Sequence, residues 1–290
     1  MKQFAGRTAV VTGGASGIGL ALARRFAREG MKIVLADIEA PALDQVVAAM
    51  KAGGADVIGV VCDVSNAKSV SALADSAYKT HGAVHLLCNN AGVSSQAAPS
   101  WNQTEADWRW VLGVNLGGVI HGIQAFVPRM IAQDSEGHIV NTASLAGLLS
   151  MPFGAPYNVS KFGVVALTEA LHYELFISQT KLRASVLCPA WVKTRILDSA
   201  RNRPAELANS SERSIDEEWR KAFEARLQEG LTPETVADRV FEAVRDEQLY
   251  VLTHPEYKPA LEARHADVAA ARNPDIKKML GGLGEAANKS

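Results

Sequence analysis

The sequence predicts one doubly wound α/β domain over residues 1–290, with a parallel sheet covered by helices on both faces. Seven short apolar runs recur along the chain, and most are continuous rather than alternating. This is typical of strands buried on both faces. Longer stretches with helical periodicity separate the runs, and such alternation builds right-handed βαβ units. Because no repeat or long linker divides the chain, we expect a single domain.

The predicted elements follow one another in a regular order. A small and polar tail, residues 281–290, should end the chain after a C-terminal helix within residues 257–290. Strands are expected at residues 8–11, 33–36, 57–61, 84–88, 138–143, 183–188 and 249–253. Helices are expected at residues 17–29, 41–51, 68–81 and 156–178, and around residue 115.

Residues 195–230, which follow the sixth predicted strand, interrupt the alternation of strands and helices because they are highly charged. Four apolar residues in this segment recur at four-residue spacing, which places them on one helical face. Ligands of open α/β sheets bind at the carboxyl ends of the strands, so this segment can be a substrate lid. A peripheral helix that docks its stripe on the body is the equal alternative. The stripe consists of Ile215, Trp219, Phe223 and Leu227.

Composition argues against several protein classes. The formal net charge of −1 lacks the basic excess of a nucleic-acid binder. No apolar run approaches the roughly 18 residues of a bilayer-spanning helix, and the first residues show no signal-peptide core. We therefore expect a cytoplasmic protein without membrane contact. Cys62, Cys88 and Cys188 end apolar runs and should be buried. Neither cysteines nor histidines show metal-ligand spacing, so no metal is expected.

A glycine-rich loop, TGGASGIG, joins the first predicted strand to the first helix. Glycines let the backbone approach a pyrophosphate, and the helix N-terminus offers free N–H groups and a partial positive charge. Because a strand precedes the loop and a helix follows it, the pattern predicts a Rossmann-type dinucleotide site. The expected contacts in this loop are Gly13, Ser16, Gly17, Ile18 and Gly19.

The second predicted strand ends at Asp37, eighteen residues after Gly19. A carboxylate at this place can accept hydrogen bonds from both ribose hydroxyls and would repel a 2′-phosphate. Neither Ser16 nor Ile38 is a Lys or Arg that would offset the repulsion. The sequence therefore predicts NAD rather than NADP, with Asp37 and Ile38 beside the adenosine ribose.

Tyr157 and Lys161 are four residues apart, on one face of a predicted helix. Ser144 ends the fifth predicted strand. Alcohol oxidation needs a base as well as a hydride acceptor, and a free tyrosine, with a pKa of about 10, is a poor base near neutrality. A nearby ammonium and an oxidised nicotinamide would both favour the phenolate. These residue types would suit such chemistry, with Tyr157 as the base, Lys161 lowering its pKa, and Ser144 holding the substrate oxygen.

With these motifs, residues 6–252 resemble the shorter branch of the short-chain dehydrogenase/reductase family, whose glycine spacing matches Gly13, Gly17 and Gly19. The resemblance implies a catalytic tetrad in which Asn115 holds a water that relays the proton through Lys161. It also implies a homo-oligomer, a homotetramer or homodimer. The tetrad would be Asn115, Ser144, Tyr157 and Lys161.

The same resemblance assigns three further cofactor segments. The NNAG motif would shape the adenosine side, the CDV motif would contact adenine, and the PAWVKT motif would bind the nicotinamide amide. The implied contacts, together with the catalytic pair, are Cys62, Asp63, Val64, Asn90, Ala91, Gly92, Tyr157, Lys161, Pro189, Val192 and Thr194.

The substrate is expected to be hydrophobic, because the apolar loop 145–154 must flank the reacting carbon. Trp191 and the aromatic stripe can extend that surface, or they can pack on one another as core. Residues 113–130 and 249–256 resemble a subgroup that includes dehydrogenases of the benzylic alcohol in lignin-derived aryl ethers. The expected reaction interconverts a hydrophobic secondary alcohol and its ketone. An aromatic alcohol is one candidate, and steroid, cyclic-alcohol and acyl substrates are the others. An NAD-sensing protein without turnover and an NADP-linked carbonyl reductase are the alternatives.

Overall fold

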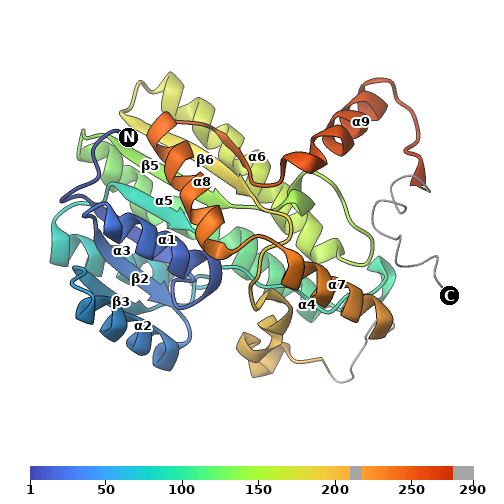
Figure 1. The fold of residues 1–290 in the computed structure, drawn as a ribbon, viewed down its shortest axis with the longest axis horizontal. Coiled ribbons are helices and arrows are strands. Elements are labelled where there is room, and N and C mark those ends of the chain that lie inside the picture. Colours follow the sequence, from blue (N-terminus) through green and yellow to red (C-terminus); the bar gives the residue numbers. More distant parts are fainter. Residues whose placement is uncertain (210–216, 277–290) are drawn as a thin grey trace.

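The computed structural model describes residues 1–209 and 217–276, and its centre is a parallel sheet of seven strands (Figure 1). The strand order is β3-β2-β1-β4-β5-β6-β7, which confirms the predicted fold class. Every predicted strand is present, within two residues of its expected bounds. The strands are β1 (Thr8–Thr12), β2 (Lys32–Asp37), β3 (Val57–Val61), β4 (Leu86–Asn89), β5 (Gly137–Thr142), β6 (Leu182–Cys188) and β7 (Tyr250–Leu252).

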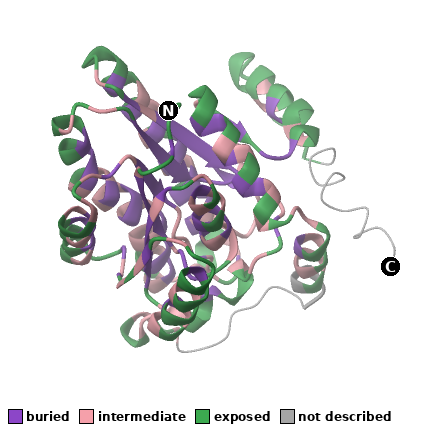
Figure 2. Ribbon diagram, turned by 60° about the vertical axis from the view of Figure 1, so that its left-hand side comes forward, coloured by how far each residue is buried: buried purple, intermediate pink, exposed green. Residues whose placement is uncertain are grey.

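Helices cover both faces of the sheet, so the strands are buried and the outer helix surfaces are exposed (Figure 2). Leu22, Phe26 and Val240 pack on one face, and Leu73, Phe126 and Leu171 on the other. The first face carries α1 (Gly17–Arg28), α2 (Ala40–Ala52) and α8 (Pro233–Asp246). The second carries α3 (Ala67–His81), α5 (Gly118–Ala132) and α6 (Ala155–Ile177), with α4 (Glu105–Leu112) beside α6. Helices α7 (Glu217–Glu229) and α9 (Lys258–Ala269) follow late in the chain.

Side-chain caps fix several helix starts. The Asn66 side chain accepts hydrogen bonds from two backbone N–H groups of α3, and Thr104 and Asp107 form a capping box on α4. Such caps satisfy N–H groups that have no partner within the helix. Helix α3 ends at Gly82, whose φ of 78° favours glycine.

Strands β1 and β4 are neighbours in the sheet although two strands and their helices separate them in the sequence. The chain leaves β1 toward β2 and later returns to the other side of β1 at β4. Ligands of open α/β sheets bind in the crevice that forms at such a switch of strand order. The glycine loop after β1 and the NNAG motif after β4 therefore come to lie at the same edge.

One stretch, Glu105–Ala132, is long and apolar enough to cross a membrane by length and composition alone. The sequence expectation of no such segment was wrong in this respect, because averaged hydropathy tolerates the glycines and single polar residues that interrupt the apolar ones. In the structure α5 packs against α3 and β4, and α4 packs against α6. The stretch therefore serves as a core helix of this domain.

Glycines in this stretch allow close packing within the chain. A Cβ on Gly122 would lie 2.0 Å from Asn89 Oδ1, and one on Gly118 would lie 2.8 Å from Val64 Cγ2. Such distances are too short for any side chain. Close packing on the strand ends thus accounts for two of the glycines without a second subunit.

The predicted C-terminal helix is present as α9, which extends away from the body of the domain (Figure 1). Leu261 is buried, and the Arg264 guanidinium stacks over the Phe162 ring of α6. The predicted tail, residues 281–290, lies outside the described residues.

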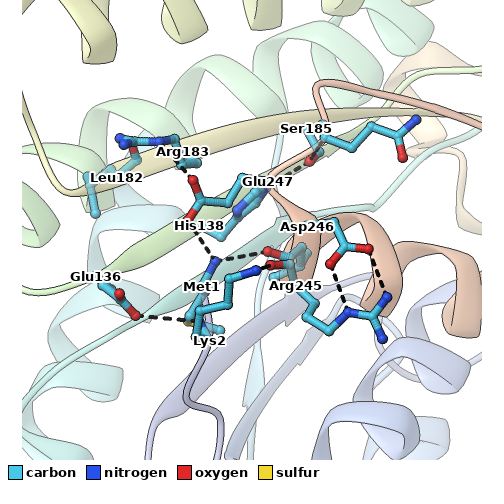
Figure 3. A network of polar contacts seen from close by, with 12 residues as sticks. Met1, Lys2, Glu136, His138, Leu182, Arg183, Ser185, Arg245, Asp246 and Glu247 are labelled. Carbon is cyan, nitrogen blue, oxygen red and sulfur yellow. Dashed lines mark hydrogen bonds and ion pairs between the residues drawn. The ribbon is translucent and has the colours of Figure 1, made fainter.

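A polar network joins β5, β6 and the end of α8 at the amino edge of the sheet (Figure 3). His138 Nε2 lies 2.7 Å from Ser185 Oγ, which donates to the Gln248 carbonyl. The His138 proton is therefore on Nε2, and Nδ1 is buried without a partner in the described part of the chain. Burial lowers the pKa of His138 to about 3.

We expect this histidine to make the fold sensitive to acid. In the unfolded chain the His138 imidazole is protonated below about pH 6.5, whereas in the folded protein it is protonated only below about pH 3. Its contribution is thus fully present above about pH 6.5 and lost as pH falls, at up to about 1.4 kcal/mol per pH unit. Urea unfolding from about pH 7 to about pH 5 should show a shallower pH dependence in His138→Gln than in the wild type. Equal slopes would contradict the assignment, and exposed His265→Asn is the matched control.

Candidate active site

A cleft lies outside the carboxyl ends of the strands and gathers most of the predicted site residues. Two predicted residues, Gly19 and Asn115, are not among those that line it. Its lining includes the predicted residues Gly13, Ser16, Gly17, Ile18, Asp37, Ile38, Cys62, Asp63, Val64, Asn90, Ala91, Gly92, Ser144, Tyr157, Lys161, Pro189, Val192 and Thr194.

The glycine loop forms one wall of the cleft. Gly13 and Gly17 have φ values of 63° and 51°, a region that favours glycine. A Cβ on Gly19 would lie 2.0 Å from the Gly13 carbonyl oxygen, so Gly19 lets α1 pack against the loop. Helix α1 begins at Gly17, with no acidic residue in its first turn. Its free N–H groups fit a pyrophosphate.

Asp37 closes β2 at the edge of the cleft and is 9% exposed. Its Oδ2 accepts a hydrogen bond from Ala15 N at 2.9 Å, and Oδ1 accepts from Glu39 N at 3.0 Å. These two backbone groups fix the carboxylate next to the glycine loop. Its position fits recognition of a ribose by its hydroxyls.

Thr12 and Asn90 join the ends of β1 and β4. The Thr12 hydroxyl accepts from Asn90 N at 2.9 Å and from Ala91 N at 3.1 Å. The Asn90 side chain donates back to the Thr12 carbonyl at 3.0 Å. These bonds hold the NNAG motif beside the glycine loop, so the two motifs form one continuous surface.

Tyr157 and Lys161 lie in the first turns of α6. The Lys161 ammonium is 5.5 Å from the centre of the Tyr157 ring and donates to the Thr142 carbonyl at 2.9 Å. Lys161 is 3% exposed, and burial lowers its pKa to about 8. Near neutral pH the side chain is therefore still charged. A Cβ on Gly92 would lie 3.4 Å from its Nζ, so the NNAG backbone approaches the ammonium closely.

Burial raises the pKa of Tyr157, and the neighbouring Ser144 side chain opposes this shift only in part. The direction is opposite to the sequence expectation, which counted the positive charges of Lys161 and of an oxidised nicotinamide. Within the chain alone, desolvation of the phenolate outweighs the stabilisation.

Ser144 and Asn115, the other two predicted tetrad residues, are both buried and hydrogen-bonded. The Ser144 hydroxyl donates to the Pro189 carbonyl at 3.3 Å and accepts from Ala146 N at 3.1 Å. Asn115 is fully buried in a π-helical turn, Gly113–Gly117. Such turns are frequent at functional sites.

Asn115 reaches Tyr157 through a relay of hydrogen bonds. Its side chain bonds to both backbone groups of Val93, at 2.8 and 2.9 Å. It also donates to Ser160 Oγ at 3.1 Å, and that hydroxyl donates to the Tyr157 carbonyl at 2.7 Å. Asn115 therefore connects the loop after β4 to the start of α6.

The apolar side chains that line the cleft include Val93, Trp110, Val114 and Leu227, and no residue of the loop 145–154 is among them. The loop instead bonds to the segment before α4, for example from Ala98 N to the Phe153 carbonyl.

Two of the aromatic residues expected near the substrate, Trp191 and Phe223, pack on each other, which was the alternative expectation. The Trp191 and Phe223 rings are 5.3 Å apart, edge to face, and Trp191 Nε1 donates to Tyr257 Oη at 2.8 Å. Leu227, on the same helix as Phe223, does line the cleft. Ile215 lies outside the described residues.

Several cleft residues were not expected from the sequence. Glu39 and Arg201 face each other at the adenosine end, and Thr142 supplies the carbonyl that binds Lys161. Arg201 lies in the charged segment 195–230, outside every cofactor motif, and a backbone carbonyl leaves no side-chain signal. The three cysteines are buried, as expected. Residues 1–209 and 217–276 contain no group of three metal-ligating side chains that could hold an ion.

Comparison with known proteins agrees with this geometry. Residues 7–205 match the family model for short chain dehydrogenase. The chain belongs to the short-chain dehydrogenase/reductase family. A member from Burkholderia phymatum, solved in complex with NAD, is 44% identical, with a TM-score of 0.92 over 94% of this chain and 98% of that one.

Two curated relatives extend the comparison. The C alpha-dehydrogenase of Sphingobium is 37% identical over 90% of this chain and 85% of its own length. The CLA biosynthesis dehydrogenase/reductase of Lactiplantibacillus plantarum is 33% identical over 97% and 99%. The first confirms the expected likeness to lignin aryl-ether dehydrogenases. The protein is thus an oxidoreductase of alcohol and ketone substrates.

Proposed function

We propose that the protein is an NAD-dependent dehydrogenase that interconverts a hydrophobic, aromatic secondary alcohol and its ketone. The single observation that carries this proposal is that Ser144, Tyr157 and Lys161 line the same cleft as the glycine loop and Asp37. One end of the cleft therefore fits an adenosine ribose, and the other end carries groups that can move a proton.

The chain's own residues would manage the proton. Bound NAD would supply the hydride acceptor. Ser144 would donate a hydrogen bond to the substrate oxygen in place of its bond to the Pro189 carbonyl. Tyr157 would take the hydroxyl proton, and the charged Lys161 beside it would favour the phenolate. Asn115 would act through Ser160 and the Tyr157 backbone by fixing the start of α6.

A lid over the cleft is part of the proposal, and residues 196–209 support it. Arg201 donates to Glu39 at 2.7 Å, and Asn202 donates to the same carboxylate oxygen at 2.8 Å. Arg203 pairs with Asp107 of α4 at 2.7 Å, where both side chains are almost buried. Arg201 and Arg203 thus connect this segment to both sides of the cleft. The Arg201–Glu39 pair is accessible to water, and the Arg203–Asp107 pair is almost buried.

We expect Glu39→Gln to release NAD faster, by about two- to five-fold. The Glu39–Arg201 side chains are each 27% exposed, and such pairs contribute about 0.5–1 kcal/mol. Stopped-flow displacement of NAD measures the rate, which should also become less sensitive to salt. The exposed Glu206→Gln, in the same segment, is the control. An unchanged release rate would show that the pair does not retain the cofactor.

The experiment that tests the function is formation of reduced nicotinamide at alkaline pH over aryl, cyclic and steroid secondary alcohols. Alkaline pH favours loss of the Tyr157 proton, so turnover should rise with pH. Turnover with NAD on aryl alcohols supports the proposal. Binding of NAD without turnover on any class would favour the sensing alternative, and preference for NADP would favour the carbonyl reductase.

The predicted homotetramer or homodimer, in the cytoplasm, also remains a proposal. Apolar side chains on the outer face of α6 support the assembly, because Tyr173, Phe176 and Ile177 are 57%, 77% and 77% exposed. A contiguous apolar surface of this kind is typical of an interface.

A further inference from the structure

His254 follows β7 and contacts the turn after β6, residues 189–192. Pro189, Ala190 and Val192 of this turn line the cleft on the side of Ser144 and Lys161. His254 itself is not among the residues that line the cleft, and it is 9% exposed. Any influence on the site must therefore pass through the turn.

Two consecutive residues of the turn bond to the same imidazole ring. Ala190 N lies 3.2 Å from His254 Nδ1, and His254 Nε2 lies 3.0 Å from the Trp191 carbonyl oxygen. A backbone N–H only donates and a carbonyl only accepts. The ring must therefore be neutral, with its proton on Nε2 and a lone pair on Nδ1.

The two bonds differ in how far the turn depends on them. The Trp191 carbonyl also accepts from Leu231 N at 3.0 Å, so it keeps a partner without His254. The Ala190 N–H relies on Nδ1. One residue earlier, the Pro189 carbonyl accepts from Leu145 N and from the Ser144 hydroxyl. A shift of the Ala190 peptide would therefore move the partner of Ser144 as well.

We propose that His254 is a positioning residue that holds the 189–191 backbone in the shape required at the nicotinamide end of the cofactor site. This inference rests on the proposed NAD-dependent function. It goes beyond that function because it assigns control of the turn to a side chain 64 residues away in sequence. The acceptor at Nδ1 is the essential feature, and the donor at Nε2 is secondary.

The arrangement tolerates only the neutral ring. The Thr253 hydroxyl, 2.8 Å from Nδ1, can donate to the neutral ring or accept from a protonated one, whereas the Ala190 N–H can only donate. Protonation would therefore break the Ala190 bond and place a second N–H against the Ala190 N–H. Burial lowers the pKa of His254, while Glu256 and the bond to the Trp191 carbonyl raise it, and Arg239 of α8 lowers it. The net shift is downward, so the ring is neutral at pH 7. The affinity for NAD should be fully present there and decline in acid.

Substituting His254 by asparagine or by glutamine tests the two hydrogen bonds one at a time. Asparagine places an amide oxygen near the Nδ1 position, whereas glutamine places an amide nitrogen near the Nε2 position. We expect His254→Asn to bind NAD like the wild type. His254→Gln and His254→Ala should bind it about tenfold more weakly, which corresponds to about 1.4 kcal/mol. Calorimetry of NAD binding to the whole protein at neutral pH measures this order, with exposed His265→Asn as the control.

A second measurement separates positioning from general stability. As the pH falls from about 7.5 to values below the ordinary histidine pKa of about 6.5, the wild type should lose more NAD affinity than His254→Asn, which cannot titrate at this position. If all His254 variants bound NAD with equal affinity, the inference would be overturned. It would also be overturned if all three lost NAD affinity in proportion to the decrease in their melting temperatures. Wild-type protein that binds no NAD at neutral pH would instead overturn the proposed function itself.

Discussion

Tyr157→Phe should reduce turnover by about a thousandfold or more while leaving the affinity for NAD within a few-fold of the wild type. The change removes one oxygen, the only group of this side chain that can take the substrate proton. General acid–base groups contribute about 10²–10⁴ in rate. The ring itself remains, so the start of α6 and the Lys161 contact over the ring should persist.

Steady-state kinetics with a responsive alcohol, together with calorimetry of NAD binding, would check this. Tyr173→Phe on the exposed face of the same helix is the matched control, since Tyr173 is 57% exposed and is not among the residues that line the cleft. Near-normal turnover in Tyr157→Phe would disprove the role of the phenol. Loss of NAD binding as well would mean that the variant had lost the site rather than the proton transfer.

Motifs that are local in sequence were predictable. The glycine loop and the pair Tyr157–Lys161 each depend on spacing within one turn or one helix, and Asp37 marks the end of a predicted strand. The regular strands fixed the edge at which these motifs meet. The structure places all of them in one cleft. Knowledge of the family was needed only to connect these residues with Asn115 and the segments after β3, β4 and β6.

Features that depend on packing between distant segments were not predictable. His254 contacts Ala190, which is 64 residues away in sequence, and Arg201 contacts Glu39, which is 162 residues away. No periodic pattern marks such pairs. The pKa of Tyr157 belongs to the same class, because its direction follows from burial by elements outside α6. The π turn at Asn115 also escaped prediction, since a single extra residue per turn barely alters the hydrophobic period.

The packing of the aromatic stripe was not predictable either, because it also depends on distant segments. Helical spacing placed Phe223 and Leu227 on one face, and both face inward in the structure. One packs on Trp191 and the other lines the cleft. Periodicity indicates which face of a helix is apolar, but it cannot say whether a ligand or another side chain covers that face.

Asp37→Ala should narrow the preference for NAD over NADP by about a hundredfold. A carboxylate about 5 Å from a 2′-phosphate, at an effective dielectric constant of about 20, repels it by roughly 3 kcal/mol per unit charge. The chain holds Asp37 in place through Ala15 N and Glu39 N, so the carboxylate cannot swing aside. Removing it should weaken NAD binding, through the lost ribose bonds, and strengthen NADP binding.

The ratio of the two cofactor affinities is the quantity to measure, since it cancels any general damage to the loop. Asp37→Asn is the informative companion, because it removes the charge and keeps an amide oxygen for one of the two backbone N–H groups. If both variants shift the ratio alike, charge repulsion decides the choice of cofactor. If neither does, Asp37 does not read the ribose, and the nearby Arg201, whose charge Glu39 balances, becomes the group to change next.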